Sequence, residues 1–140
     1  MVRISDLEIL KILRENARTP FLQIAKKLGV SEAAIRKRVR KLERKGIIKK
    51  YTIEVDLRKI GFEINALIGI DTKPEYFIPT LEKLKHMEEV QSLYSASGDH
   101  MILIECWFKN THELTEFMRK LSSMKGIVKV CPAIILEKLK

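Results

Sequence analysis

The sequence predicts an α+β fold in two parts, an N-terminal helix-turn-helix (winged-helix-like) domain and a C-terminal ferredoxin-like βαββαβ sandwich. Apolar residues recur at helical spacing as far as Gly46 and then alternate as they do in strands. The later apolar runs follow the order strand, helix, strand, strand, helix, strand. Charge also divides the chain: residues 1–61 hold 17 Lys and Arg against 7 Asp and Glu, or +10, whereas residues 62–140 hold 10 against 11, or −1.

Two helices are expected before the motif that carries most of the positive charge. Ser5 and Glu8 have the S-x-x-E spacing of a capping box, so a first helix should begin there. Thr19 is expected to cap a second helix that begins at Pro20. Proline has no backbone N–H, but the first turn of a helix needs none. The apolar faces of these helices should pack together: Leu7, Ile9, Leu10, Ile12 and Leu13 on the first, and Phe21, Ile24, Ala25 and Leu28 on the second.

A tight turn then leads into a third helix. Gly29 supplies the left-handed backbone geometry that ends one helix, and the Ser31 hydroxyl can cap the next. Two helices that cross over so short a turn form the arrangement that places the second helix in the major groove of DNA. The segment between Pro20 and Tyr51 therefore predicts a DNA-reading element.

The third helix is predicted to have one apolar and one cationic face. At about 100° per residue, Ile35, Val39 and Leu42 share one narrow stripe that should face the core. The opposite side of the helix carries a cationic arc. Arg38 lies outside this arc and is either an ion-pair partner or a DNA contact. A charged arc is usually only a solvated surface, but charge confined to one part of the chain favours a polyanion partner. The residues of this arc are Ala33, Arg36, Lys37, Arg40 and Arg44.

A connector follows Gly46. Tyr51, Ile53 and Val55 alternate with polar residues, as in a half-buried strand, and Lys49 and Lys50 precede them as candidate phosphate contacts. The expected division is therefore a helix-turn-helix DNA-binding domain at residues 1–46, a strand and hinge connector at residues 47–61, and a ferredoxin-like oligomerisation and effector domain at residues 62–140.

Four strands and two helices are expected in the last domain. The strands cover residues 64–70, 90–96, 101–108 and 127–136, and they should form one antiparallel sheet with both helices on one face. Pro79 predicts that the first helix begins late or kinks, whereas Asn110 caps the second, which should end at Gly126. Pro132 favours an edge position or a bulge for the last strand.

Composition indicates the class of protein. The chain has 140 residues and 46% hydrophobic content, with no apolar run of the roughly 18 residues that a membrane span needs. Asp6, Glu8 and Lys11 interrupt the N-terminus where a signal peptide would be apolar. Cys106 and Cys131 lie in strand-like runs without metal-site spacing and should be buried free thiols. We expect a soluble cytoplasmic protein with no membrane partner, metal site, cofactor or catalytic residue.

The residues now carry a family resemblance. The chain resembles Lrp/AsnC transcription regulators through the segments LQIAKKLGVSEAAIRKRVRKLERKGIIKKY and SGDHMILIE, and its tail KVCPAIILEKLK is similar to that of archaeal LrpA-type members. The resemblance implies a homodimer built through the C-terminal domains, often assembled into octamers or discs, that binds pseudo-palindromic double-stranded DNA. In many members an amino acid acts as effector between dimers.

The resemblance also assigns site residues. The family's recognition helix maps onto Ser31–Lys45, which adds Ser31 and Glu32 to the DNA-binding candidates. Its effector loop maps onto residues 97–101, where His100 replaces the usual aromatic residue and Met101 the usual acidic one. The effector-binding candidates are Gly98, Asp99, His100 and Met101. Gly98 also fits a plain turn that needs a positive φ.

Two alternatives remain open beside a sequence-specific regulator. A sequence-tolerant architectural protein would use the same cations without base preference. Some siroheme decarboxylases resemble paired Lrp/AsnC domains, but His86, His100 and His112 are scattered, and no carboxylate pair or nucleophile constellation is evident. We therefore expect no enzyme activity.

Overall fold

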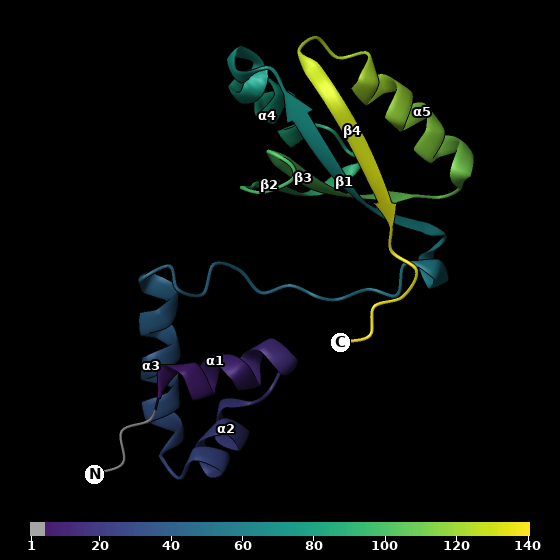
Figure 1. The fold of residues 1–140 in the computed structure, drawn as a ribbon. Coiled ribbons are helices and arrows are strands. Elements are labelled where there is room, and N and C mark those ends of the chain that lie inside the picture. The colour runs from purple at the N-terminus through teal and green to yellow at the C-terminus, as the bar shows by residue number, and fades with distance from the viewer. Residues whose placement is uncertain (1–4) are drawn as a thin grey trace. The chain divides into compact units, whose positions relative to one another are not determined.

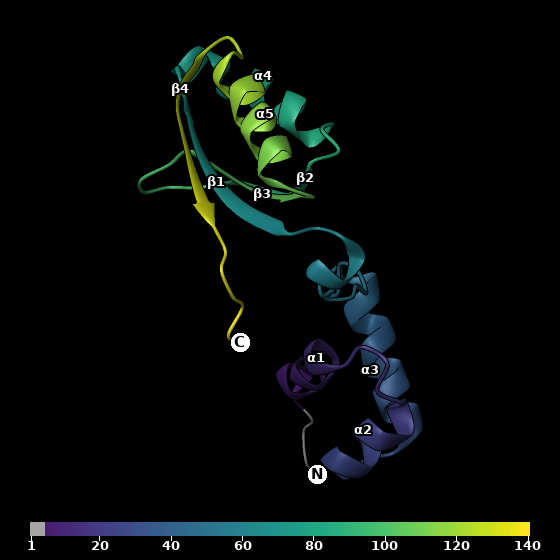
Figure 2. The same cartoon turned by 90° about the vertical axis from the view of Figure 1, so that its right-hand side faces the viewer.

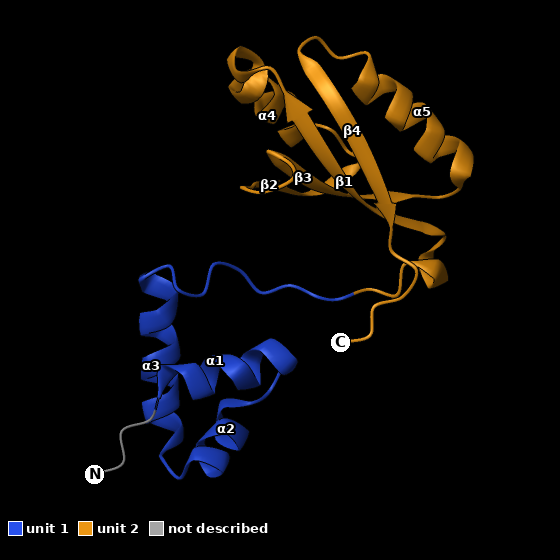
Figure 3. Cartoon of the chain, viewed as in Figure 1, with its two compact units in different colours: residues 1–54 blue, residues 55–140 orange. Residues whose placement is uncertain are grey.

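The computed structural model describes residues 5–140 and divides into two compact units, residues 1–54 and 55–140 (Figure 3). Figure 1 labels the helices and strands in chain order, with the first three helices in unit 1. The elements are α1 (Asp6–Glu15), α2 (Phe21–Leu28), α3 (Glu32–Arg44), the 3-10 helix η1 (Arg58–Ile60), β1 (Ile64–Thr72), the 3-10 helix η2 (Pro74–Tyr76), α4 (Phe77–Lys85), β2 (Val90–Ser95), β3 (Ile102–Phe108), α5 (Thr111–Ser122) and β4 (Ile127–Ile134).

The three helices of unit 1 pack around a small apolar core. Ile9 of α1, Ile24 of α2 and Ile35 of α3 are completely buried. Val39 and Leu42 are at most 2% exposed, which confirms the predicted apolar stripe of α3. Burial of this stripe fixes the rotation of α3, so its cationic face must point to solvent.

The helix boundaries follow the local hydrogen bonds. Ser5 forms the predicted capping box, with its Oγ accepting from the Leu7 amide at 3.2 Å and its own N–H donating to Glu8 at 3.3 Å. The predicted cap at Thr19 was wrong, because the Thr19 hydroxyl donates to the Asn16 carbonyl and Pro20 occupies the cap position. The predicted tight turn between α2 and α3 is confirmed: Gly29 has φ 71°, and Ser31 Oγ accepts from the Ala34 amide at 3.1 Å.

The connector forms no strand. Residues 47–57 have no ladder partner in the described part of the chain, and Ile53 is 83% exposed. The strand expected between residues 47 and 61 was therefore wrong for the single chain. Alternation indicates a segment that can pair, but a strand needs a neighbour to receive its backbone hydrogen bonds. Only the short helix η1 forms there, and it ends at Gly61 with φ 95°.

Unit 2 is a four-stranded antiparallel sheet in the order β2-β3-β1-β4. Figure 2 shows α4 and α5 on the same side of this sheet. Alternate side chains of the central strands point to the helices and form a second core, which confirms the predicted ferredoxin-like sandwich. The buried members of this core are Ala66, Ile68, Ile70, Leu84, Ile102, Ile104, Cys106, Phe108, Phe117 and Leu121.

Three details of unit 2 bear on the sequence predictions. Pro79 does not delay α4, which begins at Phe77, so the proline lies in the first turn, where no N–H is needed. Helix α5 is capped by Asn110 as predicted but ends at Ser122, ahead of Gly126. Pro132 lies in β4, an edge strand, which confirms the prediction for that position.

Candidate nucleic-acid interface and hairpin loop

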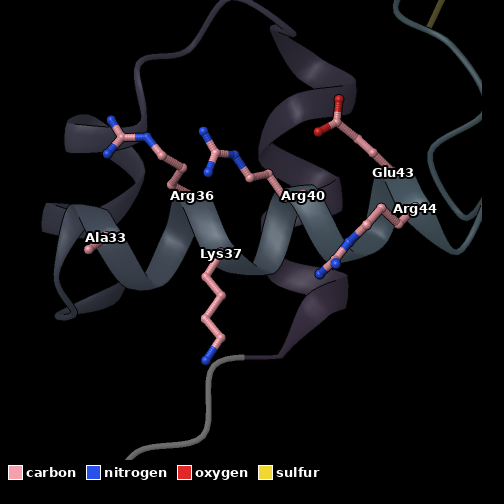
Figure 4. Close-up of a pocket in the computed structure, with 6 residues that line it drawn as sticks. All are labelled: Ala33, Arg36, Lys37, Arg40, Glu43 and Arg44. Carbon is pink, nitrogen blue, oxygen red and sulfur yellow. The ribbon is translucent and has the colours of Figure 1, made fainter.

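The exposed side of α3 forms an open hollow of about 790 Å³. The structure brings together five predicted residues here, and Glu43 joins them. Figure 4 shows Arg36, Arg40 and Glu43 pointing to one side of the helix, and Lys37 and Arg44 to the other. The lining residues are Ala33, Arg36, Lys37, Arg40, Glu43 and Arg44.

The cations of this hollow differ in their partners. Arg36 Nη2 lies 2.7 Å from Glu32 Oε1, one helical turn earlier. Within residues 5–140, Lys37, Arg40 and Arg44 form neither an ion pair nor a contact with an aromatic ring. Three positive charges of the hollow are therefore available to an anion from outside the chain.

The remaining predicted residues of this region do not line the hollow. Ser31 uses its hydroxyl to cap α3. Lys49 and Lys50 are exposed in the connector and do not line the hollow. Arg38 pairs with Asp6 of α1 at 2.9 Å, so the ion-pair alternative is confirmed for this residue.

Sequence reasoning missed the contact between Glu43 and Tyr51. The Tyr51 hydroxyl donates to Glu43 Oε2 at 3.3 Å, which ties the start of the connector to the end of α3. Partial burial, followed by the nearby Glu43 carboxylate, raises the pKa of Tyr51. The helical wheel could have found Glu43, because it places this residue near 80°, beside Arg36 at about 100°.

In unit 2, the hairpin loop between β2 and β3 is fastened to β1 by Asp71. The carboxylate binds two groups: His100 Nδ1 lies 2.8 Å from Asp71 Oδ2, and the Met101 N–H donates to Asp71 Oδ1 at 3.0 Å. The imidazole lies against Gly69, where an added Cβ would be 2.3 Å from Cδ2 of His100. Only glycine at position 69 leaves room for this arrangement.

The same contacts set the electrostatics of the loop. The hydrogen bond with His100 is the largest cause that holds the pKa of Asp71 below its ordinary value, with smaller contributions from the Met101 amide and from Lys129. Partial burial of the carboxyl acts in the opposite direction. The favourable contacts prevail, so Asp71 remains ionised in the folded protein to a lower pH than a free carboxyl.

The four effector candidates therefore separate into two pairs. Gly98 and Asp99 are exposed at the loop tip, and Gly98 has φ 118°, which confirms its role as a turn residue. His100 and the Met101 backbone point inward to Asp71. Asp71 and Gly69 were missed, since they lie about 30 residues away in the sequence and no local pattern connects them to the loop.

No group of three or more His, Cys, Asp or Glu side chains in the described part of the chain could hold a metal ion. Both cysteines are free thiols, and Cys106 is buried as predicted, whereas Cys131 in the edge strand β4 is only partly buried. Burial, ahead of the nearby Glu89 and Glu105, raises the pKa of Cys106 to about 12. None of the helices of residues 5–140 is long and apolar enough to cross a membrane.

Comparison with known proteins agrees with this geometry. Residues 3–49 match the model of winged helix-turn-helix DNA-binding domains, and residues 65–140 match the Lrp/AsnC ligand binding domain. The HTH-type transcriptional regulator LrpA of Pyrococcus horikoshii is 50% identical over 141 residues, which span all of both chains. LysM of Saccharolobus solfataricus is 43% identical over 136 residues, covering 95% of this chain and 92% of its own.

A solved structure supports the same assignment at the level of the fold. Escherichia coli AsnC, which is 29% identical, matches 99% of this chain and 96% of its own with a TM-score of 0.82. Both family models and the relatives confirm the resemblance seen in the sequence. This chain belongs to the Lrp/AsnC family of helix-turn-helix transcription regulators.

Proposed function

We propose that the protein regulates transcription by binding specific double-stranded DNA sequences through the exposed face of α3. The observation that carries the proposal is the two-sided character of this helix. Its apolar stripe is at most 2% exposed, whereas the opposite side lines a hollow that contains Arg36, Lys37, Arg40 and Arg44. A helix anchored in this way can present the cations to phosphates and base edges together.

The dimensions suit the major groove. At about 1.5 Å per residue, the 13 residues of α3 span about 20 Å, and a groove about 12 Å wide admits a helix. Ser31, Glu32 and Ala33 lie at the end of α3 that normally reaches the base edges in such motifs. Lys49 and Lys50, beyond the other end, are placed in the proposal as phosphate contacts.

One helix-turn-helix reads too few base pairs for useful specificity, so the proposal includes a second copy. Helices cover one face of the sheet in unit 2. On the other face, Leu67 is 37% exposed and Tyr94 is 56% exposed. Pairing of this face between two chains would bury those side chains and hold two readers at a fixed spacing. We infer a homodimer that binds a pseudo-palindromic site, with assembly to octamers as the family resemblance implies.

The proposal places a small amino-acid effector at the hairpin loop. Asp99 at the loop tip supplies an exposed carboxylate for an ammonium group, and Gly98 leaves the backbone open to approach. The inward hydrogen bonds of His100 and Met101 would connect the bound effector to the central strand. An effector that favours one assembly would change DNA affinity by the same coupling free energy.

Selection of genomic fragments tests this function. The purified protein is incubated with fragments at moderate salt, with and without a mixture of amino acids, and the retained DNA is sequenced. A recurring palindrome is expected, along with its loss in Arg36→Ala and Arg40→Ala variants. Equal retention of all fragments would favour the architectural alternative, and no retention at all would refute DNA binding. We propose no catalytic step for the protein and infer that it acts in the cytoplasm, where the chromosome lies.

A further inference from the structure

Arg36 is restrained from two sides. Its guanidinium lies 2.7 Å from the carboxylate of Glu32, and its Cζ lies 5.9 Å from the ring centroid of Phe21. Among the cations that line the hollow, and within residues 5–140, this arginine alone has such contacts. The side chain remains 44% exposed, so part of it is open to solvent.

The two restraining groups come from positions that are themselves fixed. Phe21 is the first residue of α2 and packs, partly buried, against the core of unit 1. Glu32 is the first residue of α3, directly after the Ser31 cap. A guanidinium between a packed ring and a carboxylate on a capped helix end has fewer accessible rotamers than a free arginine.

An arginine side chain with restricted freedom is better suited to reading a base than to contacting a phosphate. A guanine edge requires two parallel N–H groups in one direction, and a pre-positioned arginine loses less entropy when it forms them. A phosphate needs positive charge nearby and tolerates a mobile side chain. We propose that Phe21 and Glu32 are positioning residues that hold Arg36 in the direction needed to read a base. This inference rests on the proposed function in that α3 must be the element that reads DNA.

The alternative is that Glu32 and Arg36 form an ordinary surface ion pair with no role in reading DNA. Pairs between residues i and i+4 on a helix are common and stabilise it only slightly. Such a pair would have no effect on base preference, and an aromatic ring beside it would matter only for packing. Base preference at one position is therefore the measurement that separates the two explanations.

The first experiment uses a duplex that the unmodified protein selects from a pool with a randomised core. Affinity for this duplex and for each of its single-base variants is measured by fluorescence anisotropy. Arg36→Ala should weaken binding by about fivefold to a hundredfold and abolish the preference at one position of each half-site. Phe21→Leu, which keeps an apolar side chain, should weaken binding about two- to fivefold and relax the same position.

A double variant then shows whether Phe21 acts through Arg36. The combination of Phe21→Leu with Arg36→Ala should bind as Arg36→Ala does, because the ring has nothing left to position. The combination of Phe21→Leu with Arg40→Ala should instead show the product of the two separate losses. Phe21→Tyr, which keeps the ring, should restore the base preference. Leu22→Ala, at the next and half-exposed residue of α2, is the control for general damage to that helix.

Glu32→Gln gives a signature that a structural role would not produce. Removal of this negative charge should tighten binding to unrelated duplexes, because it increases the positive charge of the surface. It should also lower the ratio of affinities between the selected duplex and unrelated ones, because Arg36 is held less firmly. Unchanged or increased discrimination in Glu32→Gln would overturn the role of Glu32.

The outcomes separate the inference from the function on which it rests. If the losses from Phe21→Leu and Arg36→Ala multiply, or if Phe21→Leu weakens every duplex equally, Phe21 is not a positioning residue although α3 still reads DNA. If the unmodified protein selects no sequence from the pool, the proposed function and the inference both fail. Thermal unfolding of each variant shows whether the altered protein is folded at the temperature of the binding assay.

Discussion

Gly69→Ala should break the fastening of the hairpin loop to β1. A Cβ at position 69 would lie 2.3 Å from Cδ2 and 2.5 Å from Cγ of His100. Carbon atoms do not approach so closely, and the backbone of β1 cannot yield because it is paired on both sides, with β3 and β4. The imidazole must therefore move away and lose its contact with Asp71.

The cost can be assembled from two contributions. Displacement of a packed ring by an added methyl group costs about 1 to 3 kcal/mol. Loss of the hydrogen bond between His100 and Asp71 costs about 1 to 2 kcal/mol, a value reduced because both side chains are about one fifth exposed. The Met101 amide can still donate to Asp71. We expect the free energy of unfolding of unit 2 to fall by about 2 to 5 kcal/mol.

Urea unfolding followed by tryptophan fluorescence measures this change. Trp107 is the single tryptophan of the chain and lies in β3, with its ring centroid 5.9 Å from that of Phe62, so the signal reports on unit 2. His100→Ala should relieve the clash, so the double variant should be about as stable as His100→Ala alone. Ser97→Ala, in the same loop, is the control. A Gly69→Ala protein as stable as the unmodified one would refute the reasoning, as would fully additive losses.

Three further predictions concern charges and the connector. Because its contact with His100 lowers the folded pKa of Asp71, this carboxyl stabilises unit 2 above about pH 4 and ceases to do so as the pH falls through the folded value. Asp71→Asn should therefore flatten the loss of stability in acid, as measured by unfolding at a series of pH values. Tyr51→Phe should cost about 0.5 to 1.5 kcal/mol in unit 1, while Glu43→Gln, which keeps an acceptor, should cost less; equal losses in thermal unfolding would contradict this. Lys49→Ala should weaken binding to all duplexes alike and reduce the slope of log affinity against log salt by about 0.9, and a base-dependent loss would count against a phosphate contact.

Local signals in the sequence predicted most of unit 1. A capping box, a left-handed glycine and a stripe at helical spacing each act within a few residues, and Ser5, Gly29 and Val39 occupy the expected positions. The error at Thr19 is also local, since its hydroxyl had two acceptable uses and the chain adopts the other. Such short-range competition displaces a helix boundary by a residue without changing the fold.

Features that need a distant partner were less predictable. The connector has the pattern of a strand, but the described chain offers it no neighbour, and pattern alone cannot supply one. Asp71 and His100 are brought together by the antiparallel pairing of β1 with β3. Their contact therefore depends on the register of this strand pair, which could not be predicted from the sequence. Sheet order could be inferred from chain order and handedness, whereas individual contacts across the sheet could not.

The two carboxylates on the exposed side of α3 favour sequence-specific reading over architectural binding. Glu32 and Glu43 repel phosphates and reduce the attraction on which sequence-tolerant binding depends. Each has a defined partner in the structure, Arg36 for Glu32 and Tyr51 for Glu43. A carboxylate weakens binding to all DNA. It improves specificity when it weakens binding to incorrect sequences more than binding to the correct one. Their location beside the free cations of the hollow is therefore easier to explain for a surface that discriminates between sequences than for one that only wraps DNA.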